Sequence, residues 1–296
     1  MPAPLGRILT AMVTPFAADG ALDLDEARAV ARYLVRHGSE GLVVHGTTGE
    51  APTLSDAEKL DLVEAVAGEV GGEVPVVAGT GTYDTAHSVH LTREAVRRGA
   101  DAILAVTPYY NKPPAEGIYQ HFRAIAEAAG DRPVVLYNIP QRVVLNMEPA
   151  LLARLAGIDN VVAVKQATTD LDQARAIVED GRLALYAGND DLLVPFGEIG
   201  GIGGICVASH VAGEEMLDLQ KAIDAGDLER ARAIEAELAP LLEALSVTTN
   251  PIPVKAAMEL LGFPVGSPRL PLVPATDAER GEVRGALERR GLLARA

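Results

Sequence analysis

A lysine at the end of an uninterrupted apolar run is the residue of this chain best suited to covalent chemistry. The run Val161-Val-Ala-Val164 leads into Lys165 without polar alternation, which is typical of a strand buried on both faces. A buried lysine tends to be neutral, and a neutral amine can attack a carbonyl carbon and form a Schiff base. The alternative is a strand-ending lysine that extends its ammonium group into water. From this run alone, both interpretations stay open.

Other residues that could do chemistry follow similar apolar runs. Gly46-Thr-Thr-Gly49 is either a plain turn or a set of backbone N–H groups suited to a carboxylate or phosphate. Tyr137 ends an apolar run, and a buried phenol needs a hydrogen-bond partner. Tyr109-Tyr110 could simply pack in a loop, and Arg142 could be a solvated charge. Taken together, they would supply hydroxyls, an anion site and a cation around the amine.

The segments that must position these residues show one regular alternation along the chain. Eight apolar runs alternate with segments of helical periodicity, and this alternation predicts βαβ units and a parallel sheet. The runs are 8–13, 41–45, 75–78, 102–106, 133–137, 161–164, 183–187 and 204–208. Eight units predict a (β/α)8 TIM barrel, in which the active site lies at the carboxyl ends of the strands. A doubly wound sheet is the alternative, but the chain lacks an early glycine-rich dinucleotide-binding motif.

The alternation of strand and helix patterns ends after about Gly226. Three helical segments are expected at 227–246, 253–261 and 276–289, with Pro240 kinking or breaking the first. We therefore predict a catalytic barrel domain at 1–226 and a C-terminal three-helix appendage at 227–296. The appendage carries no strand pattern, and we expect it to serve structure or oligomerisation rather than catalysis.

Composition narrows the classes of function. The net charge of -15 argues against nucleic acid and against an anionic membrane surface as partners. A single cysteine, Cys206, excludes an intrachain disulfide and suits a reducing compartment. The start of the chain lacks the features of a signal peptide, and no apolar run approaches the ~18 residues of a membrane helix. These features predict a soluble, cytoplasmic protein.

Metal chemistry has little support in the sequence. We find no His-Glu-x-x-His, no Cys-x-x-Cys and no carboxylate set with metal-ligand spacing. Asp190-Asp191 could begin a Mg²⁺ site, but the pair also suits the N-terminus of the helix that follows. We expect no metal.

The motifs in combination resemble the pyruvate-dependent aldolase family that includes N-acetylneuraminate lyase and dihydrodipicolinate synthase. The resemblance extends over nearly the whole chain. It rests on Gly46-Thr-Thr-Gly-Glu50, Val106-Thr-Pro-Tyr-Tyr-Asn-Lys-Pro113, Tyr137-Asn-Ile-Pro140 and Asn250-Pro-Ile-Pro-Val-Lys-Ala-Ala257. It implies a barrel enzyme that needs neither metal nor organic cofactor, because a covalent lysine–pyruvate imine carries the chemistry.

The resemblance also implies roles for individual residues. Lys165 would form the imine with pyruvate and Tyr137 would move protons, with Thr48 linking Tyr137 to Tyr110. Tyr110 would reach into the site of a neighbouring subunit, which implies at least a dimer, and relatives are commonly tetramers. Further substrate contacts would come from Thr47 and Thr48, Gly188, Ile205 and Arg142.

Arg142 resembles the arginine that binds L-aspartate-4-semialdehyde, and the sugar-acid aldolases of the family generally lack it. The expected reaction is therefore condensation of pyruvate with that aldehyde. Two positions depart from the usual pattern, namely Val143-Val144-Leu145 after Arg142 and Gln166 after Lys165. The alternative is a class I aldolase or dehydratase that acts on a 2-keto-3-deoxy sugar acid or a related 2-oxo acid.

The resemblance bears on regulation as well. Members inhibited by lysine carry an acidic residue at the position of His87, and the best-known inhibited type carries histidines at Asp56 and Lys59. We expect weak or absent inhibition by lysine.

Overall fold

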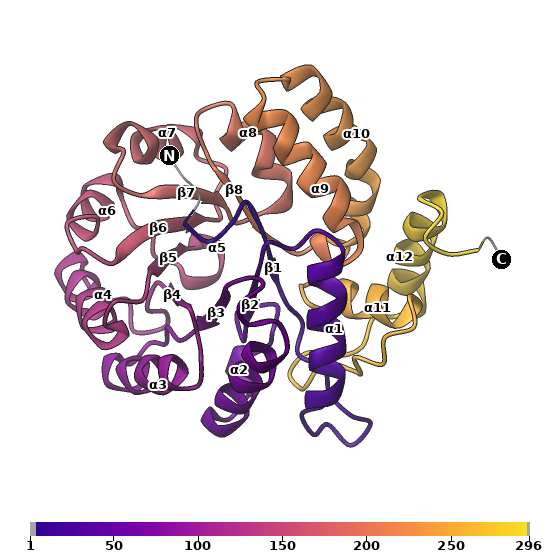
Figure 1. Cartoon of the computed structure of the whole chain (residues 1–296), viewed down its shortest axis with the longest axis horizontal. Coiled ribbons are helices and arrows are strands. Elements are labelled where there is room, and N and C mark those ends of the chain that lie inside the picture. The colour runs from indigo at the N-terminus through magenta and orange to yellow at the C-terminus, as the bar shows by residue number, and fades with distance from the viewer. Residues whose placement is uncertain (1–3, 295–296) are drawn as a thin grey trace.

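The structure is a computed structural model and describes residues 4–294, so the outermost residues of the two predicted regions lie outside the described part. Eight parallel strands form a closed barrel in which each strand pairs with the next and β8 pairs with β1 (Figure 1). The strands are β1 (Ile8–Ala11), β2 (Gly41–Val44), β3 (Val76–Gly79), β4 (Ala102–Val106), β5 (Val134–Asn138), β6 (Val161–Gln166), β7 (Ala184–Ala187) and β8 (Gly203–Cys206). The predicted (β/α)8 barrel is confirmed.

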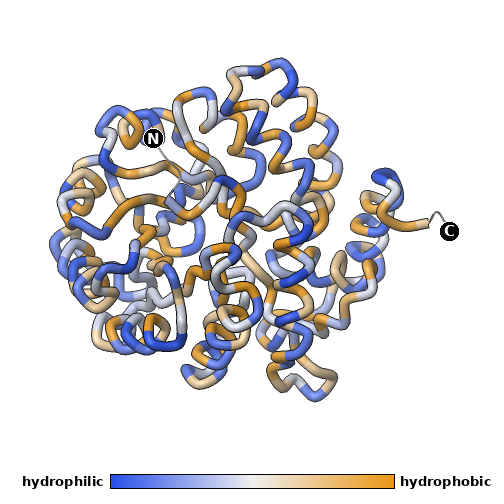
Figure 2. The backbone as a smooth tube through the Cα atoms, viewed as in Figure 1, coloured by the Kyte–Doolittle hydropathy of each residue, from blue (hydrophilic) through white to orange (hydrophobic). Residues whose placement is uncertain are grey.

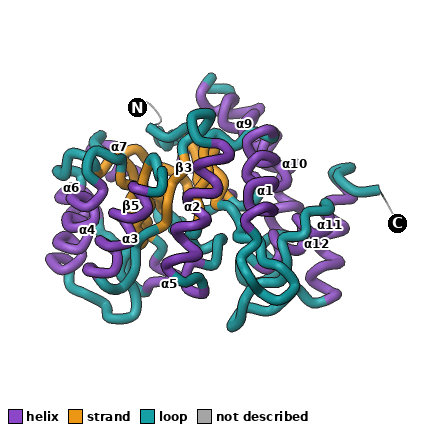
Figure 3. The backbone as a smooth tube through the Cα atoms, turned by 60° about the horizontal axis from the view of Figure 1, so that its bottom comes forward, coloured by secondary structure: helices purple, strands orange, loops and turns teal. Residues whose placement is uncertain are grey.

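The strands lack polar alternation because both of their faces are buried. Along β2, Val43 packs into a cluster inside the barrel, whereas Leu42 and Val44 pack outward against the helices. Figure 2 shows the resulting concentration of apolar residues along the central strands, and Figure 3 shows the helices surrounding them. Adjacent residues of a strand therefore have opposite surroundings, which decides whether a side chain can reach the barrel interior.

Helices follow the strands and cover the outside of the barrel. They are α1 (Leu24–Arg36), α2 (Asp56–Val70), α3 (Thr85–Arg97), α4 (Ala115–Ala129), α5 (Pro140–Val143), α6 (Pro149–Leu155), α7 (Leu171–Asp180), α8 (Leu193–Gly197) and α9 (Ser209–Asp224). The 3₁₀ turns are η1 (Ala51–Thr53) and η2 (Asp190–Leu192). The predicted capping box of α2 is present, with the Ser55 and Glu58 side chains each accepting a hydrogen bond from the other's backbone N–H.

The C-terminal part contains the three expected helices: α10 (Leu228–Ala244), α11 (Ile252–Leu260) and α12 (Asp277–Arg289). Pro240 lies inside α10 without ending it, so the predicted break is absent. The helices pack on the barrel's helical layer, since α10 contacts α9, and Tyr33 of α1 meets Phe263 with ring centroids 4.6 Å apart. The predicted boundary at Gly226 falls in the turn between α9 and α10, and the division into two domains stays a prediction.

Candidate active site

Lys165 lies inside the barrel. It follows Ala163 on the inner face of β6, and strand register places it beside Tyr137 of β5 and Tyr186 of β7. Its side chain is only 5% exposed, and its Nζ lies 4.5 Å from the centroid of the Tyr137 ring. The amine therefore does not extend to bulk solvent, and the interpretation of Lys165 as a solvated strand end is wrong.

A cavity of about 810 Å³ opens above Lys165 at the carboxyl ends of the strands. Six of the eight predicted site residues line it, namely Thr47, Thr48, Tyr137, Arg142, Lys165 and Gly188. They come from the ends of β2, β5, β6 and β7, the edge of the barrel at which the sequence places the site. The predicted hydroxyls, amine and guanidinium thus share one cavity.

The loop after β2 brings Thr47 and Thr48 to this cavity in a tight turn. A Cβ on Gly49 would lie 2.9 Å from the backbone of His45, so only glycine fits there. Glu50 follows in the left-handed region with a φ of 56°. Thr48 is buried, and its Oγ1 accepts a hydrogen bond of 2.9 Å from the Nδ2 of Asn250. The turn therefore presents a buried hydroxyl to the cavity rather than to solvent.

Arg142 supplies the positive charge at the mouth of the cavity. It lies on the short helix α5 directly after β5, and its side chain is exposed. Among residues 4–294, no carboxylate lies within salt-bridge distance of its guanidinium. A bound carboxylate could therefore pair with it in a bidentate geometry.

Comparisons with known proteins show which family this chain belongs to. The sequence model of the Dihydrodipicolinate synthetase family matches residues 4–290. The 4-hydroxy-tetrahydrodipicolinate synthase of Moorella thermoacetica is 53% identical over 290 residues, covering 97% of this chain and 99% of that protein. This chain belongs to the dihydrodipicolinate synthetase family.

Solved structures of family members share the whole fold. The dihydrodipicolinate synthase of Cyanidioschyzon merolae, crystallised with lysine bound, superimposes with a TM-score of 0.96 at 42% identity, covering 98% of this chain and 99% of that chain. The chloride-inhibited enzyme of Acinetobacter baumannii in complex with pyruvate has a TM-score of 0.94 at 35% identity, covering 98% and 100%. The family resemblance inferred from the motifs is confirmed.

Two predicted site residues lie outside the cavity of this family member. Tyr110 is 90% exposed with a φ of 66°, and none of its atoms lines the cavity. Ile205 on β8 is fully buried in the cluster inside the barrel. Among the described residues, no hydrogen bond links Tyr137, Thr48 and Tyr110. The contribution of Tyr110 to a neighbouring subunit stays a prediction.

The departures from the usual family pattern lie away from the cavity. Val143 packs into the cluster inside the barrel and Val144 is exposed, so neither lines the cavity. Gln166 is fully buried next to Lys165 in sequence, and its Oε1 accepts a hydrogen bond of 3.1 Å from the Nδ2 of Asn138. None of the four departing residues, Val143, Val144, Leu145 and Gln166, therefore lines the cavity.

The sequence did not indicate that the C-terminal part forms one wall of the cavity. Arg232, Glu235, Ala236, Ala239, Leu242 and Glu243 of α10 line it, together with Leu245, Ser246 and Asn250. No local pattern could have revealed this wall, because it forms only where α10 folds back over the strand ends. The C-terminal part is thus more than a structural or oligomeric appendage.

Asp190 also lines the cavity, and it lies with Asp191 in the first turn of η2, directly before α8, as the helix N-terminus alternative predicted. Its carboxylate accepts hydrogen bonds from the backbone N–H groups of Val207, at 2.9 Å, and Ala208, at 2.7 Å, just before α9. Burial raises the pKa of this carboxyl group. Asp190 therefore fixes the loop between β8 and α9.

No cluster of three or more potential metal-binding side chains occurs among residues 4–294.

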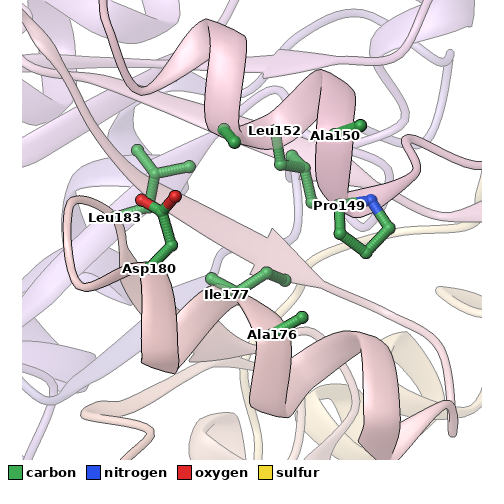
Figure 4. Close-up of a pocket in the computed structure, with 8 residues that line it drawn as sticks. Pro149, Ala150, Leu152, Ala176, Ile177, Asp180 and Leu183 are labelled. Atoms are coloured by element: carbon green, nitrogen blue, oxygen red, sulfur yellow. The ribbon is translucent and has the colours of Figure 1, made fainter.

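A second hollow of about 250 Å³ lies between α6 and α7 on the outside of the barrel (Figure 4). Its wall is mostly apolar, with the carboxylate of Asp180 at one side. None of the predicted site residues lies there.

No helix of the described part is long and apolar enough to cross a membrane.

Proposed function

We propose that this chain is a lyase that condenses pyruvate with L-aspartate-4-semialdehyde to 4-hydroxy-tetrahydrodipicolinate, a step of lysine and diaminopimelate biosynthesis. The observation that carries the proposal is the buried amine of Lys165, beside Tyr137 and beneath the guanidinium of Arg142 in one cavity. The Moorella thermoacetica relative, which is 53% identical to this chain, is named 4-hydroxy-tetrahydrodipicolinate synthase, and this name supports the same reaction.

The first half of the proposed reaction builds a nucleophile from pyruvate. The Lys165 amine attacks the ketone carbon through its nitrogen lone pair, and the resulting carbinolamine loses its hydroxyl group as water. Tyr137, whose ring centroid lies 4.5 Å from the amine, would give that hydroxyl its proton. The C=N bond then acidifies the neighbouring methyl group, and transfer of one methyl proton to the Tyr137 phenolate yields an enamine and restores the phenol.

The second half joins the two substrates. The enamine carbon attacks the aldehyde carbon, a new C–C bond forms, and the aldehyde oxygen takes up a proton. Lys165 is released by transimination or hydrolysis, which restores the free amine. The backbone after β2, at Thr47 and Thr48, would hold the pyruvate carboxylate, with Gly188 lining that end of the pocket. Arg142 would hold the carboxylate of the acceptor.

The proposed chemistry needs no metal or organic cofactor, because the lysine imine itself withdraws the electrons. We place the enzyme in the cytoplasm. We also propose a homo-oligomer, at least a dimer and by analogy with relatives a tetramer, in which the exposed Tyr110 completes the site of a second subunit. Thr48 would then connect that tyrosine with Tyr137.

A screen of acceptors tests the proposed reaction. The purified enzyme is supplied with pyruvate and either L-aspartate-4-semialdehyde or an aldehyde of the sugar-acid series, and the products are identified by mass spectrometry. We expect turnover with the semialdehyde alone. Turnover restricted to sugar-acid substrates would replace the synthase by the aldolase alternative.

A further inference from the structure

The segment from Asn250 to Lys255 holds the loop that carries Thr48 at two points. The Nδ2 of Asn250 donates to Thr48 Oγ1 at 2.9 Å, and the Nζ of Lys255 donates to Glu50 Oε1 at 3.0 Å. The Lys255 and Glu50 side chains are 2% and 0% exposed, so this ion pair is shielded from solvent. A part of the chain about two hundred residues away thus fixes the hydroxyl-bearing turn of the cavity.

The chemistry of the Asn250 contact makes the Thr48 oxygen an acceptor and leaves its hydroxyl proton unused. An amide NH₂ group can only donate, so the Thr48 oxygen must be the acceptor in this bond. The hydroxyl proton is then available to another acceptor. Among the described residues, the structure contains no acceptor for that proton, and Thr48 lines the cavity that also contains Tyr137. The proton is therefore free to point into the cavity.

The other end of the Asn250 side chain argues that packing alone does not explain this residue. Its Oδ1 is buried and has no hydrogen-bond partner among residues 4–294. An unpaired buried carbonyl is unfavourable, and an apolar side chain of similar size would avoid it. What an apolar side chain could not supply is the NH₂ donor to Thr48.

We propose that Asn250 is a positioning residue of the lysine–imine reaction, which holds the Thr48 hydroxyl as a donor directed at the Tyr137 phenol oxygen. The inference rests on the proposed function. When Tyr137 gives its proton to the departing hydroxyl group of the carbinolamine, its oxygen becomes a phenolate. A hydroxyl that is already oriented as a donor stabilises that phenolate without having to reorient first. Asn250 itself touches neither substrate nor Lys165 in this role.

A double-mutant cycle on the rate of imine formation tests this role. The enzyme is mixed with pyruvate, quenched with borohydride at successive times and analysed by intact mass. Asn250→Ala and Thr48→Val should each slow the appearance of the reduced adduct about tenfold to a hundredfold. Because both act through the same hydroxyl, the double variant should be no slower than the slower single variant. Additive losses would overturn the proposal, since they would mean that Asn250 acts independently of Thr48.

Two further variants distinguish an effect on the orientation of the Thr48 hydroxyl from a general effect on the structure of the turn. Asn250→Asp keeps the shape of the side chain but replaces the donor by a second acceptor, so it should trap pyruvate as slowly as Asn250→Ala. A rate at the wild-type level would overturn the proposal. Thr249→Ala removes an exposed side chain of the same turn and should leave the rate unchanged. Rates are normalised to the folded fraction of each variant, measured by circular dichroism.

Pyruvate trapping by the wild-type enzyme distinguishes failure of the proposed function from failure of the proposal on Asn250. A wild-type enzyme that traps no pyruvate would contradict the proposed function. A wild-type enzyme that traps pyruvate while Asn250→Ala does so equally fast would contradict only the role of Asn250.

Discussion

Arg142 is the residue on which recognition of the acceptor depends in this account. Its guanidinium is exposed at the mouth of the cavity without a carboxylate partner in the described part of the chain. Removing it leaves the acceptor carboxylate without its charged partner, an effect of about 2–5 kcal/mol. In the proposed reaction pyruvate binds at the buried Lys165, so its binding should be affected little.

We therefore expect Arg142→Ala to lower kcat/KM for the aldehyde by roughly 30-fold to 5000-fold, while borohydride trapping of pyruvate proceeds normally. Steady-state kinetics with the aldehyde varied measures the first effect. Arg93→Ala, which removes an exposed arginine of α3, serves as the control. An equal loss of pyruvate trapping in Arg142→Ala would contradict this division of roles.

Three residues at the start of α2 and α3 bear on regulation. The Asp56 carboxylate lies 2.9 Å from His87 Nε2 and 3.6 Å from the ammonium group of Lys59, which is 7% exposed. Its hydrogen bond with His87 and the charge of Lys59 help to keep the Asp56 pKa below its ordinary value despite the opposing effect of burial. The acidic group present here is thus already paired with side chains of the protein.

We expect free lysine at millimolar concentration to leave the rate nearly unchanged, because an incoming ammonium group would meet Lys59 and a carboxylate that is already paired. Initial rates at increasing lysine concentration measure this. Inhibition at sub-millimolar lysine would show that the interpretation of His87, Asp56 and Lys59 is wrong.

Some residues of the candidate site could be predicted from the sequence, and others could not. Lys165, Tyr137 and Thr48 could be recognised because each residue follows an apolar run, and the barrel places such positions together. Asn250 and the wall of α10 could not, because their contacts join parts of the chain that local patterns treat separately. The exposure of Tyr110 shows the same limit, since one chain does not contain its proposed partner.

At the scale of elements, the short helix α5 ends in a strained residue. Val144 has a φ of 67°, a left-handed conformation that is unfavourable for a β-branched side chain, and it is 66% exposed. Because the side chain is exposed, burial compensates little for this strain. Glycine adopts the same backbone conformation without a Cβ.

We expect Val144→Gly to raise the free energy of unfolding by up to about 1 kcal/mol, since relief of roughly 1–2 kcal/mol of left-handed strain exceeds the added entropy of glycine in the unfolded chain. Urea unfolding measures the change. Leu171→Gly, an exposed apolar position at the start of α7 with ordinary helical backbone, should instead lower it. Destabilisation by Val144→Gly would show that the valine side chain makes a compensating contact.

The elements themselves were predictable to different degrees. The strands were found because both faces are buried, which leaves continuous apolar runs such as that of β6. Of the kink or break predicted at Pro240, the break does not occur. Proline removes one backbone hydrogen bond, but Leu238 and Leu241 on either side are buried, and their packing keeps α10 continuous.

Three buried histidines make the stability of the whole molecule sensitive to acid. Burial lowers the pKa values of His45, His121 and His210, each to about 4. His210 illustrates the cause, because its Nε2 accepts a hydrogen bond from the Val13 N–H and must stay unprotonated to do so. In the unfolded chain the same groups take up protons near pH 6.5.

Between about pH 6.5 and pH 4 the unfolded chain therefore binds more protons than the folded one, and stability must fall as the pH is lowered. Each histidine contributes a slope of about 1.4 kcal/mol per pH unit within that window. We expect urea unfolding at about pH 5 to give a clearly lower free energy than at about pH 7, with a smaller difference in His210→Gln. Equal free energies at the two pH values would contradict the burial of these groups as neutral imidazoles.

The central claim is that Lys165 forms the imine with pyruvate. The most direct measurement is borohydride reduction in the presence of pyruvate, followed by intact mass and peptide mapping. We expect one reduced adduct per chain, located on Lys165, absent in Lys165→Ala and retained in Lys221→Ala, which changes an exposed lysine on α9. No adduct in the wild-type protein, or an adduct that persists in Lys165→Ala, would contradict it.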